Sequence, residues 1–145
     1  MEIMISEYRA PVAGDLVAIN KLLRELNAGA SALTFPRLQK ICAAPNMHLL
    51  VARNADSIIG MATLEIAETL METYGYAHDV VVSSDYRGKG IGKMLMEKLI
   101  STAKEIGAKH IDLTSNPQRD TGQFYMSLGF VKRDTDCYRK ELANR

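Results

Sequence analysis

The first 45 residues contain one stretch with the apolar spacing of a strand and two with the spacing of a helix. Alternating apolar residues predict a first strand over residues 2–9. Apolar residues three and four positions apart then predict two helices. Asp15 can cap the first, which stops near Gly29, and the second covers residues 34–44 and ends at Pro45. Their inner faces carry Leu16, Ile19, Leu23 and Leu26 in the first helix and Phe35, Leu38, Ile41 and Cys42 in the second.

The middle of the chain has the pattern of three consecutive strands. Residues 47–53 form an apolar run, residues 54–56 suit a hairpin turn, and residues 57–68 form the return strand. A third strand is predicted over residues 73–83. It contains three β-branched valines at positions 80–82, which is typical of a strand buried in a sheet.

Helical spacing returns over residues 91–106, and a predicted strand follows at residues 109–114. Asn116 can cap a shorter helix, and one or two final strands are expected at residues 130–133 and 138–142. The long helix is defined by Ile91, Met94, Leu95, Leu99, Ala103 and Ile106 with Gly107 as its stop, and the short one begins with Pro117, carries Thr121, Phe124, Tyr125 and Leu128, and ends at Gly129.

This order of elements, β-α-α-β-β-β-α-β-α-β, predicts an α/β fold with one mixed sheet. Antiparallel strands that meet a β-α-β crossover give a mostly antiparallel sheet with helices on both faces. A chain of 145 residues has the size of an ordinary domain, and its 47% hydrophobic content supports a core. We therefore expect a single domain over residues 1–145.

Composition and charge narrow the classes of function. A net charge of +1 gives no electrostatic reason to expect nucleic acid or an anionic membrane as a partner. No apolar stretch reaches the roughly 20 residues of a membrane span, and the first residues lack the basic start of a signal peptide, so we expect a cytoplasmic protein. Cys42 and Cys137 lie far apart and the three histidines are scattered, so we expect reduced thiols and no metal site.

The strongest chemical signal is the glycine-rich turn between the valine strand and the long helix. Glycine has no Cβ and lets backbone N–H groups approach a ligand, and N–H groups at the start of a helix favour an anion. Cationic side chains add positive charge, so the turn suits a pyrophosphate. Its residues are Arg87, Gly88, Lys89, Gly90, Ile91, Gly92 and Lys93.

Three kinds of pyrophosphate site compete for this turn. A P-loop would need Lys and then Ser or Thr after its last glycine, and Gly92 is not followed by that pair. A dinucleotide fingerprint starting at Gly88 would need its third glycine at the position of Lys93. Arg87-x-x-Gly90-x-Gly92 after an apolar strand instead resembles the acetyl-CoA-binding motif of the GCN5-related N-acetyltransferases, the GNAT family.

Later residues extend this resemblance over the whole chain. Asn116, the pair Phe124-Tyr125 and the run Leu128-Gly129-Phe130 are similar to the second half of the family pattern. Residues 137–142 resemble its closing strand. The resemblance is specific from about Asp79 onward, and before that residue it rests on the order of elements.

The resemblance implies acetyl-CoA as co-substrate and a place for it. In the GNAT fold the strands at residues 78–82 and 110–114 are parallel neighbours that splay apart, and the cofactor lies in the cleft. The pantetheine arm is expected to pair with the backbone of Val80, Val81 and Val82, as an added strand does. The pyrophosphate is expected on the glycine-rich turn.

Further cofactor contacts follow from the same resemblance. Asn116 would bind the pantetheine, cap its own helix, or do both. Arg119 would reach the phosphates or stay solvated. A backbone N–H near Val80 or Val81 would polarise the thioester carbonyl.

Acetyl transfer to an amine also needs an acid for the thiolate and a base for the amine. By its resemblance to the family's Phe-Tyr position, Tyr125 protonates the thiolate, whereas periodicity alone makes it a packed aromatic. Asp79 is the favoured base, with His78 and Glu65 as alternatives. Adjacent strand residues face opposite ways, so His78 and Asp79 are not expected to enter the cleft together. Related amino-sugar-phosphate acetyltransferases carry two acidic residues where this chain has His78-Asp79, which argues against an amino-sugar acceptor.

These expectations describe an enzyme that moves an acetyl group from acetyl-CoA to the primary amine of a small molecule, by direct transfer in a ternary complex. Neither cysteine lies in the predicted cleft motifs, so an acetyl-cysteine intermediate is not expected. The alternatives are acetylation of a protein lysine or N-terminus, a non-catalytic acyl-CoA-binding regulatory module, and a nucleotide-binding domain. Dimers are common in the family, so a homodimer also stays open.

Overall fold

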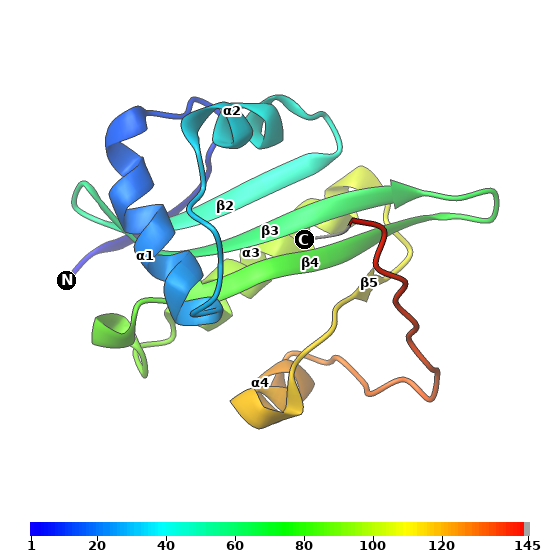
Figure 1. Cartoon of the computed structure of the whole chain (residues 1–145). Coiled ribbons are helices and arrows are strands. Elements are labelled where there is room, and N and C mark those ends of the chain that lie inside the picture. Colours follow the sequence, from blue (N-terminus) through cyan, green and yellow to red (C-terminus); the bar gives the residue numbers. More distant parts are fainter. Residues whose placement is uncertain (144–145) are drawn as a thin grey trace. The chain divides into compact units, whose positions relative to one another are not determined.

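In the computed structural model, which describes residues 1–143, the chain folds into two compact units (Figure 1). The first unit, Met1–Leu113, holds a β-sheet and its covering helices, and the second unit begins at Thr114. The expected single domain over residues 1–145 stays a prediction, and its last two residues lie outside the described part of the chain.

The first unit is built on a five-stranded sheet. Its strands are β1 (Ile3–Glu7), β2 (Met47–Asn54), β3 (Ser57–Glu68), β4 (Thr73–Val82) and β5 (Ile111–Asp112), and they lie in this order across the sheet. Strands β1 to β4 pair antiparallel, and β5 pairs with β4 in parallel, with Gly75 opposite Ile111. The predicted mixed, mostly antiparallel sheet is therefore confirmed.

Helices cover both faces of this sheet, as predicted. In Figure 1, α1 (Leu16–Leu26) lies in front of the sheet and α3 (Ile91–Ile106) behind it, and α2 (Phe35–Ala43) packs into the same core as α1. Side chains of β3 alternate between the two faces. Met61 belongs to the core under α1 and α2, whereas a Cβ on Gly60 would meet Leu95 of α3 at 3.1 Å. The core under α1 and α2 includes Ile19, Leu22, Leu38, Cys42, Leu49, Val51, Met61 and Val81.

Two predicted helix ends have different outcomes in the structure. α3 stops at Gly107, whose φ of 95° lies in the left-handed region, as predicted. The expectation that Asp15 caps α1 is wrong. Asp15 already has helical backbone angles, and its carboxylate accepts hydrogen bonds from the Tyr8 hydroxyl at 2.7 Å and the Arg53 guanidinium at 3.1 Å. Tertiary partners therefore take the oxygen that a cap would have used.

Between residues 114 and 143, the second unit contains two short helical segments. The first is η3 (Pro117–Arg119), which Asn116 caps by accepting a hydrogen bond from the Gln118 backbone N–H at 3.0 Å. The second is α4 (Gly122–Ser127). Asn116 therefore caps a separate 3-10 turn and not the helix that carries Tyr125, which begins after the left-handed residue Asp120.

Two predictions about the later strands are wrong. The strand expected at residues 109–114 is only two residues long, and no strand forms at residues 130–133 or 138–142 in the part of the chain that the structure describes. The apolar side chains of the expected closing segments stay 81–90% exposed, at Val131, Tyr138 and Leu142. Strand preference reflects packing on a pleated, half-buried surface, and these residues lack that burial.

Candidate active site

The glycine-rich turn connects β4 to α3 through the short helix η2 (Ser84–Tyr86). Gly88 and Gly90 have φ values of 77° and 79°, which residues with a Cβ rarely adopt. Gly90 is the N-cap of α3, and a Cβ on either glycine would meet no atom within 4 Å. The first N–H groups of α3 lack helical partners, so open space at this turn adjoins donors that suit an anion.

Positive side chains surround the same turn. Arg87 is about half exposed, and its Nε donates to the carbonyl oxygen of Val82 at 3.2 Å. Lys89 and Lys93 are exposed. These cations remain accessible to solvent beside the start of α3, which is the charge pattern predicted for a pyrophosphate site.

A carboxylate that sequence reasoning missed fixes this turn to α1. Glu25 Oε1 accepts a hydrogen bond from the Ser84 backbone N–H at 2.9 Å and lies 3.9 Å from Nη2 of Arg87. Burial acts to raise the pKa of Glu25, but the Ser84 hydrogen bond and the charges of Arg87 and Lys21 outweigh burial and lower it. Glu25 and Ser84 are 59 positions apart, so no local pattern could have linked them.

A β-bulge distorts β4 at the predicted catalytic residues. Residues 61 and 63 of β3 pair with Val81 and His78, so Asp79 and Val80 together oppose a single residue. Asp79 has a left-handed φ of 53°. The prediction that His78 and Asp79 face opposite ways assumes regular alternation, and regular alternation does not hold across a bulge.

Beyond Tyr76, β4 no longer pairs with β5. Gly75 and Tyr76 lie opposite Ile111 and Asp112, so the parallel pair is confirmed but lies earlier in β4 than residues 78–82. Val81 is buried in the core, and its two neighbouring valines are half-buried. Within residues 1–143 no strand pairs with these valines on the β5 side, where the Val82 carbonyl accepts from Arg87, so this edge suits an extended amide-bearing ligand.

Of the three candidate bases, the structure brings two together. Nε2 of His78 on β4 lies 2.8 Å from Oε1 of Glu65 on β3, and each side chain is 39% exposed. The Tyr76 ring stacks on the imidazole with 4.6 Å between ring centroids. Asp79 is exposed and, within residues 1–143, makes no side-chain hydrogen bond or ion pair.

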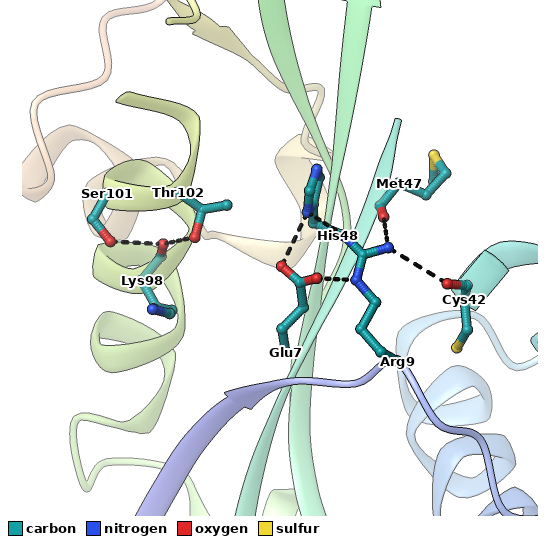
Figure 2. A network of polar contacts seen from close by, with 8 residues as sticks. All are labelled: Glu7, Arg9, Cys42, Met47, His48, Lys98, Ser101 and Thr102. Carbon is teal, nitrogen blue, oxygen red and sulfur yellow. Dashed lines mark hydrogen bonds and ion pairs between the residues drawn. The ribbon is translucent and has the colours of Figure 1, made fainter. Parts of the chain in front are cut away.

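A second histidine–glutamate pair, also missed from the sequence, lies at the β1–β2 side of the sheet (Figure 2). Nδ1 of His48 is 3.0 Å from Oε1 of Glu7, and Arg9 forms an ion pair with the same carboxylate. Arg9 also donates to the backbone oxygen of Met47 at 3.4 Å. The His48 side chain is only 12% exposed, so its imidazole is poorly accessible to ligands.

Three predicted site residues lie in the second unit. Tyr125 is half-buried, with Phe124 and Phe130 in edge contact at 5.1 and 5.9 Å between ring centroids. Burial raises the pKa of Tyr125, and the nearby charge of Arg119 offsets part of that rise. The hydroxyl of Tyr125 is therefore protonated at neutral pH. Its assembly with the β4 residues, and that of Asn116 and Arg119, stays a prediction.

Metal-ligand geometry, helix length and cysteine burial bear on which kinds of site the described residues can form. No group of three or more histidine, cysteine or acidic side chains in residues 1–143 is arranged to hold a metal ion. No helix in that same range is both long and apolar enough to cross a bilayer. Burial raises the pKa of the Cys42 thiol, which lies in the core under α2.

Comparison with known proteins gives consistent results. The acetyltransferase (GNAT) family model matches residues 16–130. The chain is 29% identical over 89 residues to the aminoalkylphosphonate N-acetyltransferase of Salmonella typhimurium, covering 59% of this chain and 58% of that one. It is 34% identical over 79 residues to a probable glucosamine 6-phosphate N-acetyltransferase of Drosophila melanogaster, covering 52% of this chain and 35% of that one.

A solved structure supports the same assignment. A putative acetyltransferase from Agrobacterium tumefaciens superposes with a TM-score of 0.82 at 25% identity, over 97% of this chain and all of that one. The chain matches less than two thirds of the length of the curated relatives. The family match covers most of the chain and agrees with the sheet, the parallel strand pair and the glycine-rich turn, and the protein therefore belongs to the GNAT family of acetyltransferases.

Proposed function

We propose that this protein is an N-acetyltransferase that moves an acetyl group from acetyl-CoA to the primary amine of a small molecule, by direct transfer in a ternary complex. One observation carries the proposal. The open turn at the start of α3, with its two left-handed glycines, directly follows the end of β4, which has no strand partner on the β5 side within the described residues. A pyrophosphate and an amide-bearing arm need these two features side by side.

The residues of the first unit fit the co-substrate in two places. The first N–H groups of α3, together with Arg87, Lys89 and Lys93, would hold the pyrophosphate. The backbone of Val80–Val82 would pair with the amides of the pantetheine arm. Asn116 and Arg119 would add contacts from the second unit.

The reaction needs two proton transfers. A base takes one proton from the ammonium form of the acceptor, and the free nitrogen then attacks the thioester carbonyl carbon. A C–N bond forms, the C–S bond breaks, and the second nitrogen proton is lost as the sulfur gains one. The products are an amide and a free thiol. Backbone N–H groups near the β4 bulge would polarise the carbonyl.

Tyr125 would supply the proton to the leaving thiolate. The hydroxyl is the protonated form at neutral pH, because burial raises its pKa. Its ring is fixed by two aromatic neighbours, which suits a donor that must hold one orientation. An acetyl-cysteine route has less support, since Cys42 is buried in the core and Cys137 is exposed in the second unit.

The proposed acceptor is a class of small molecules that carry a primary amine. The two relatives named above act, by their names, on an aminoalkylphosphonate and on glucosamine 6-phosphate. Both are small molecules with a primary amine, which supports that class for this protein. The chain has His78-Asp79 at the place of two acidic residues in the amino-sugar enzymes, so glucosamine 6-phosphate itself is not the expected acceptor.

The test starts with calorimetric titration of acetyl-CoA, using ATP and NAD as controls. Selective acetyl-CoA binding is expected, and stronger binding of ATP or NAD would contradict the proposal. A release assay for free CoA thiol then compares 2-aminoethylphosphonate, glucosamine 6-phosphate, spermidine and a lysine-containing peptide. Turnover with the peptide alone would show a protein acetyltransferase, and binding without any turnover would favour a regulatory acyl-CoA-binding module.

Tyr125→Phe separates an enzyme from such a binding module. We expect kcat to fall by roughly 10–100-fold because the general acid is lost, while the Kd for acetyl-CoA stays the same. Tyr138→Phe, at an exposed tyrosine of the same unit, is the matched control and should leave both values unchanged. An unchanged kcat in Tyr125→Phe would remove the acid role.

A further inference from the structure

We infer that His78 is the proton acceptor for the incoming amine and that Glu65 is the positioning residue that makes it one. The inference rests on the proposed function and deepens it, because it assigns the base. It also replaces the favoured candidate of the sequence, Asp79. The geometry of three side chains on neighbouring strands points to this assignment.

Sheet register places the pair on one face. Thr63 pairs with His78 and Glu65 pairs with Tyr76, so all four side chains face the same way. Glu65 therefore reaches its histidine diagonally across two hydrogen-bonded strands. Both residues lie within regular parts of β3 and β4, on the bulge-free side of His78, so their backbones are held by the ladder.

The hydrogen bond fixes which nitrogen of His78 is basic. An ionised carboxylate only accepts hydrogen bonds, so Glu65 Oε1 at 2.8 Å receives the proton on Nε2. Nδ1 then carries the lone pair that can take a proton from an amine. As the ring becomes protonated, the carboxylate stabilises the new positive charge. The stacked Tyr76 ring restrains the plane of the imidazole.

Exposure and hydrogen-bond length together separate His78 from the other two histidines. His78 and Glu65 are each 39% exposed, so an amine can reach the ring, and the bulge next to His78 marks the site of the unpaired β4 edge. His110 is exposed but lies 3.5 and 3.7 Å from its carboxylates, without a hydrogen bond as short as that of His78. In the His48–Glu7 pair the imidazole is only 12% exposed, so an amine has little access to it.

Other titratable groups near His78 can also affect the pH dependence of the reaction. In the first unit the titratable residues that share its face of the sheet or adjoin it in sequence are Glu65, Tyr74, Tyr76, Asp79, His110 and Asp112. Only Glu65 is hydrogen-bonded to the ring. Replacing Asp79 by Asn therefore tests a neighbouring charge without touching the hydrogen bond.

The experiment compares Glu65→Gln, Glu65→Ala and His78→Ala with the control Glu7→Gln, using the most rapidly acetylated amine of the panel above. We expect kcat to fall by roughly 10–100-fold in Glu65→Ala, less in Glu65→Gln, which keeps an acceptor oxygen, and most in His78→Ala. The Kd for acetyl-CoA should not change in any of them. Glu7→Gln should keep the wild-type kcat.

Two readouts distinguish a base from a structural residue. The decline of kcat/KM toward low pH should be lost in His78→Ala but retained in Asp79→Asn. Added imidazole should restore part of the rate of His78→Ala and none of the rate of Glu65→Ala, whose own imidazole is still present. Loss of the low-pH decline in Asp79→Asn, or wild-type kcat in both Glu65 variants, would overturn the inference. A wild-type protein that neither binds acetyl-CoA nor turns over would instead overturn the proposed function.

Discussion

The molecule contains two histidine–glutamate pairs of nearly equal length in very different settings. His78 and Glu65 lie 2.8 Å apart on β4 and β3, and His48 and Glu7 lie 3.0 Å apart on β2 and β1. Register puts them on opposite faces, because His78 is opposite Thr63 while His48 is opposite Leu64. Residue type and distance alone therefore do not distinguish them.

What distinguishes the two pairs is their surroundings. Arg9 pairs with Glu7 and places Nη2 3.1 Å from Nδ1 of His48, so that imidazole is already engaged and only 12% exposed (Figure 2). His78 has one carboxylate partner, one stacked ring and an exposed remainder. A closed, fully paired network stabilises the fold, whereas an open pair with one basic nitrogen available can act on a ligand.

The largest effect that would sharpen this comparison is expected for the two histidines themselves. His78→Gln should lower kcat by roughly 10²–10⁴-fold, the usual contribution of a general base. His48→Gln should leave kcat unchanged and lower the free energy of unfolding by roughly 1–3 kcal/mol, because it disturbs a partly buried polar network. Steady-state kinetics and urea denaturation of both variants measure these changes. Equal effects of the two variants on kcat would break the comparison.

An effect of intermediate size, on acetyl-CoA affinity, is expected at the glycine-rich turn between β4 and α3. Gly90→Ala forces a Cβ into a left-handed φ of 79° at the start of α3, which costs about 1–2 kcal/mol and displaces the N–H groups of the turn. We expect acetyl-CoA affinity, measured by calorimetry, to fall about tenfold, the equivalent of 1.4 kcal/mol.

Gly107→Ala is the matched control for this change. Gly107 has a left-handed φ of 95° at the other end of the same helix, and a Cβ there would also meet nothing within 4 Å. Its substitution should reduce stability by a similar amount without changing affinity. If both variants lose affinity equally, the turn is not the pyrophosphate site.

The smallest effect is expected at Glu25, a carboxylate that holds the turn without belonging to either pair. Its folded-state pKa is lowered, since the Ser84 hydrogen bond and the charges of Arg87 and Lys21 outweigh burial. Such a group stabilises the fold above its unfolded pKa of about 4.3, and that stability is lost as pH falls through the folded pKa. Glu25→Gln should therefore lower stability at pH 7 by about 1 kcal/mol.

The pH dependence supplies the control for this prediction. The difference between Glu25→Gln and wild type should shrink as the pH falls from about 5 toward 2, where the native carboxylate is protonated as well. Chemical denaturation across that range measures it. Glu97→Gln, at an exposed position of α3, should show no such difference. A constant difference from pH 7 to pH 2 would mean that the Glu25 charge does not stabilise the turn.

Much of the fold follows from local signals. Apolar spacing predicts three helices of the first unit, and β3 matches the predicted residues 57–68 without a change. The glycine-rich turn is also local, because a positive φ at Gly88 and Gly90 and the start of α3 depend on residues next to one another. The family resemblance began with this segment and drew further support from Asn116, Phe124-Tyr125 and Leu128-Gly129-Phe130.

Other expectations failed because they depend on tertiary contacts, which a local sequence pattern does not contain. Asp15 has the chemistry of a cap, yet Tyr8 and Arg53 reach it from the end of β1 and from β2. The segments at residues 130–133 and 138–142 have strand-like composition but no ladder within residues 1–143. Asp15 is therefore taken by tertiary partners, whereas the closing segments find no strand partner in the described residues.

The candidate site also has one part that depends on local sequence and one part that depends on tertiary contacts. By itself, the sequence determined the strand, turn and helix that suit a pyrophosphate, since their backbone angles and charges come from consecutive residues. Only the tertiary structure decided which carboxylate joins which histidine, because Glu65 and His78 are 13 positions apart and meet through strand register. The bulge at Asp79 likewise exists only as a mismatch between two paired strands. Chemistry that depends on one segment can be read from the chain, and chemistry that depends on register requires the fold.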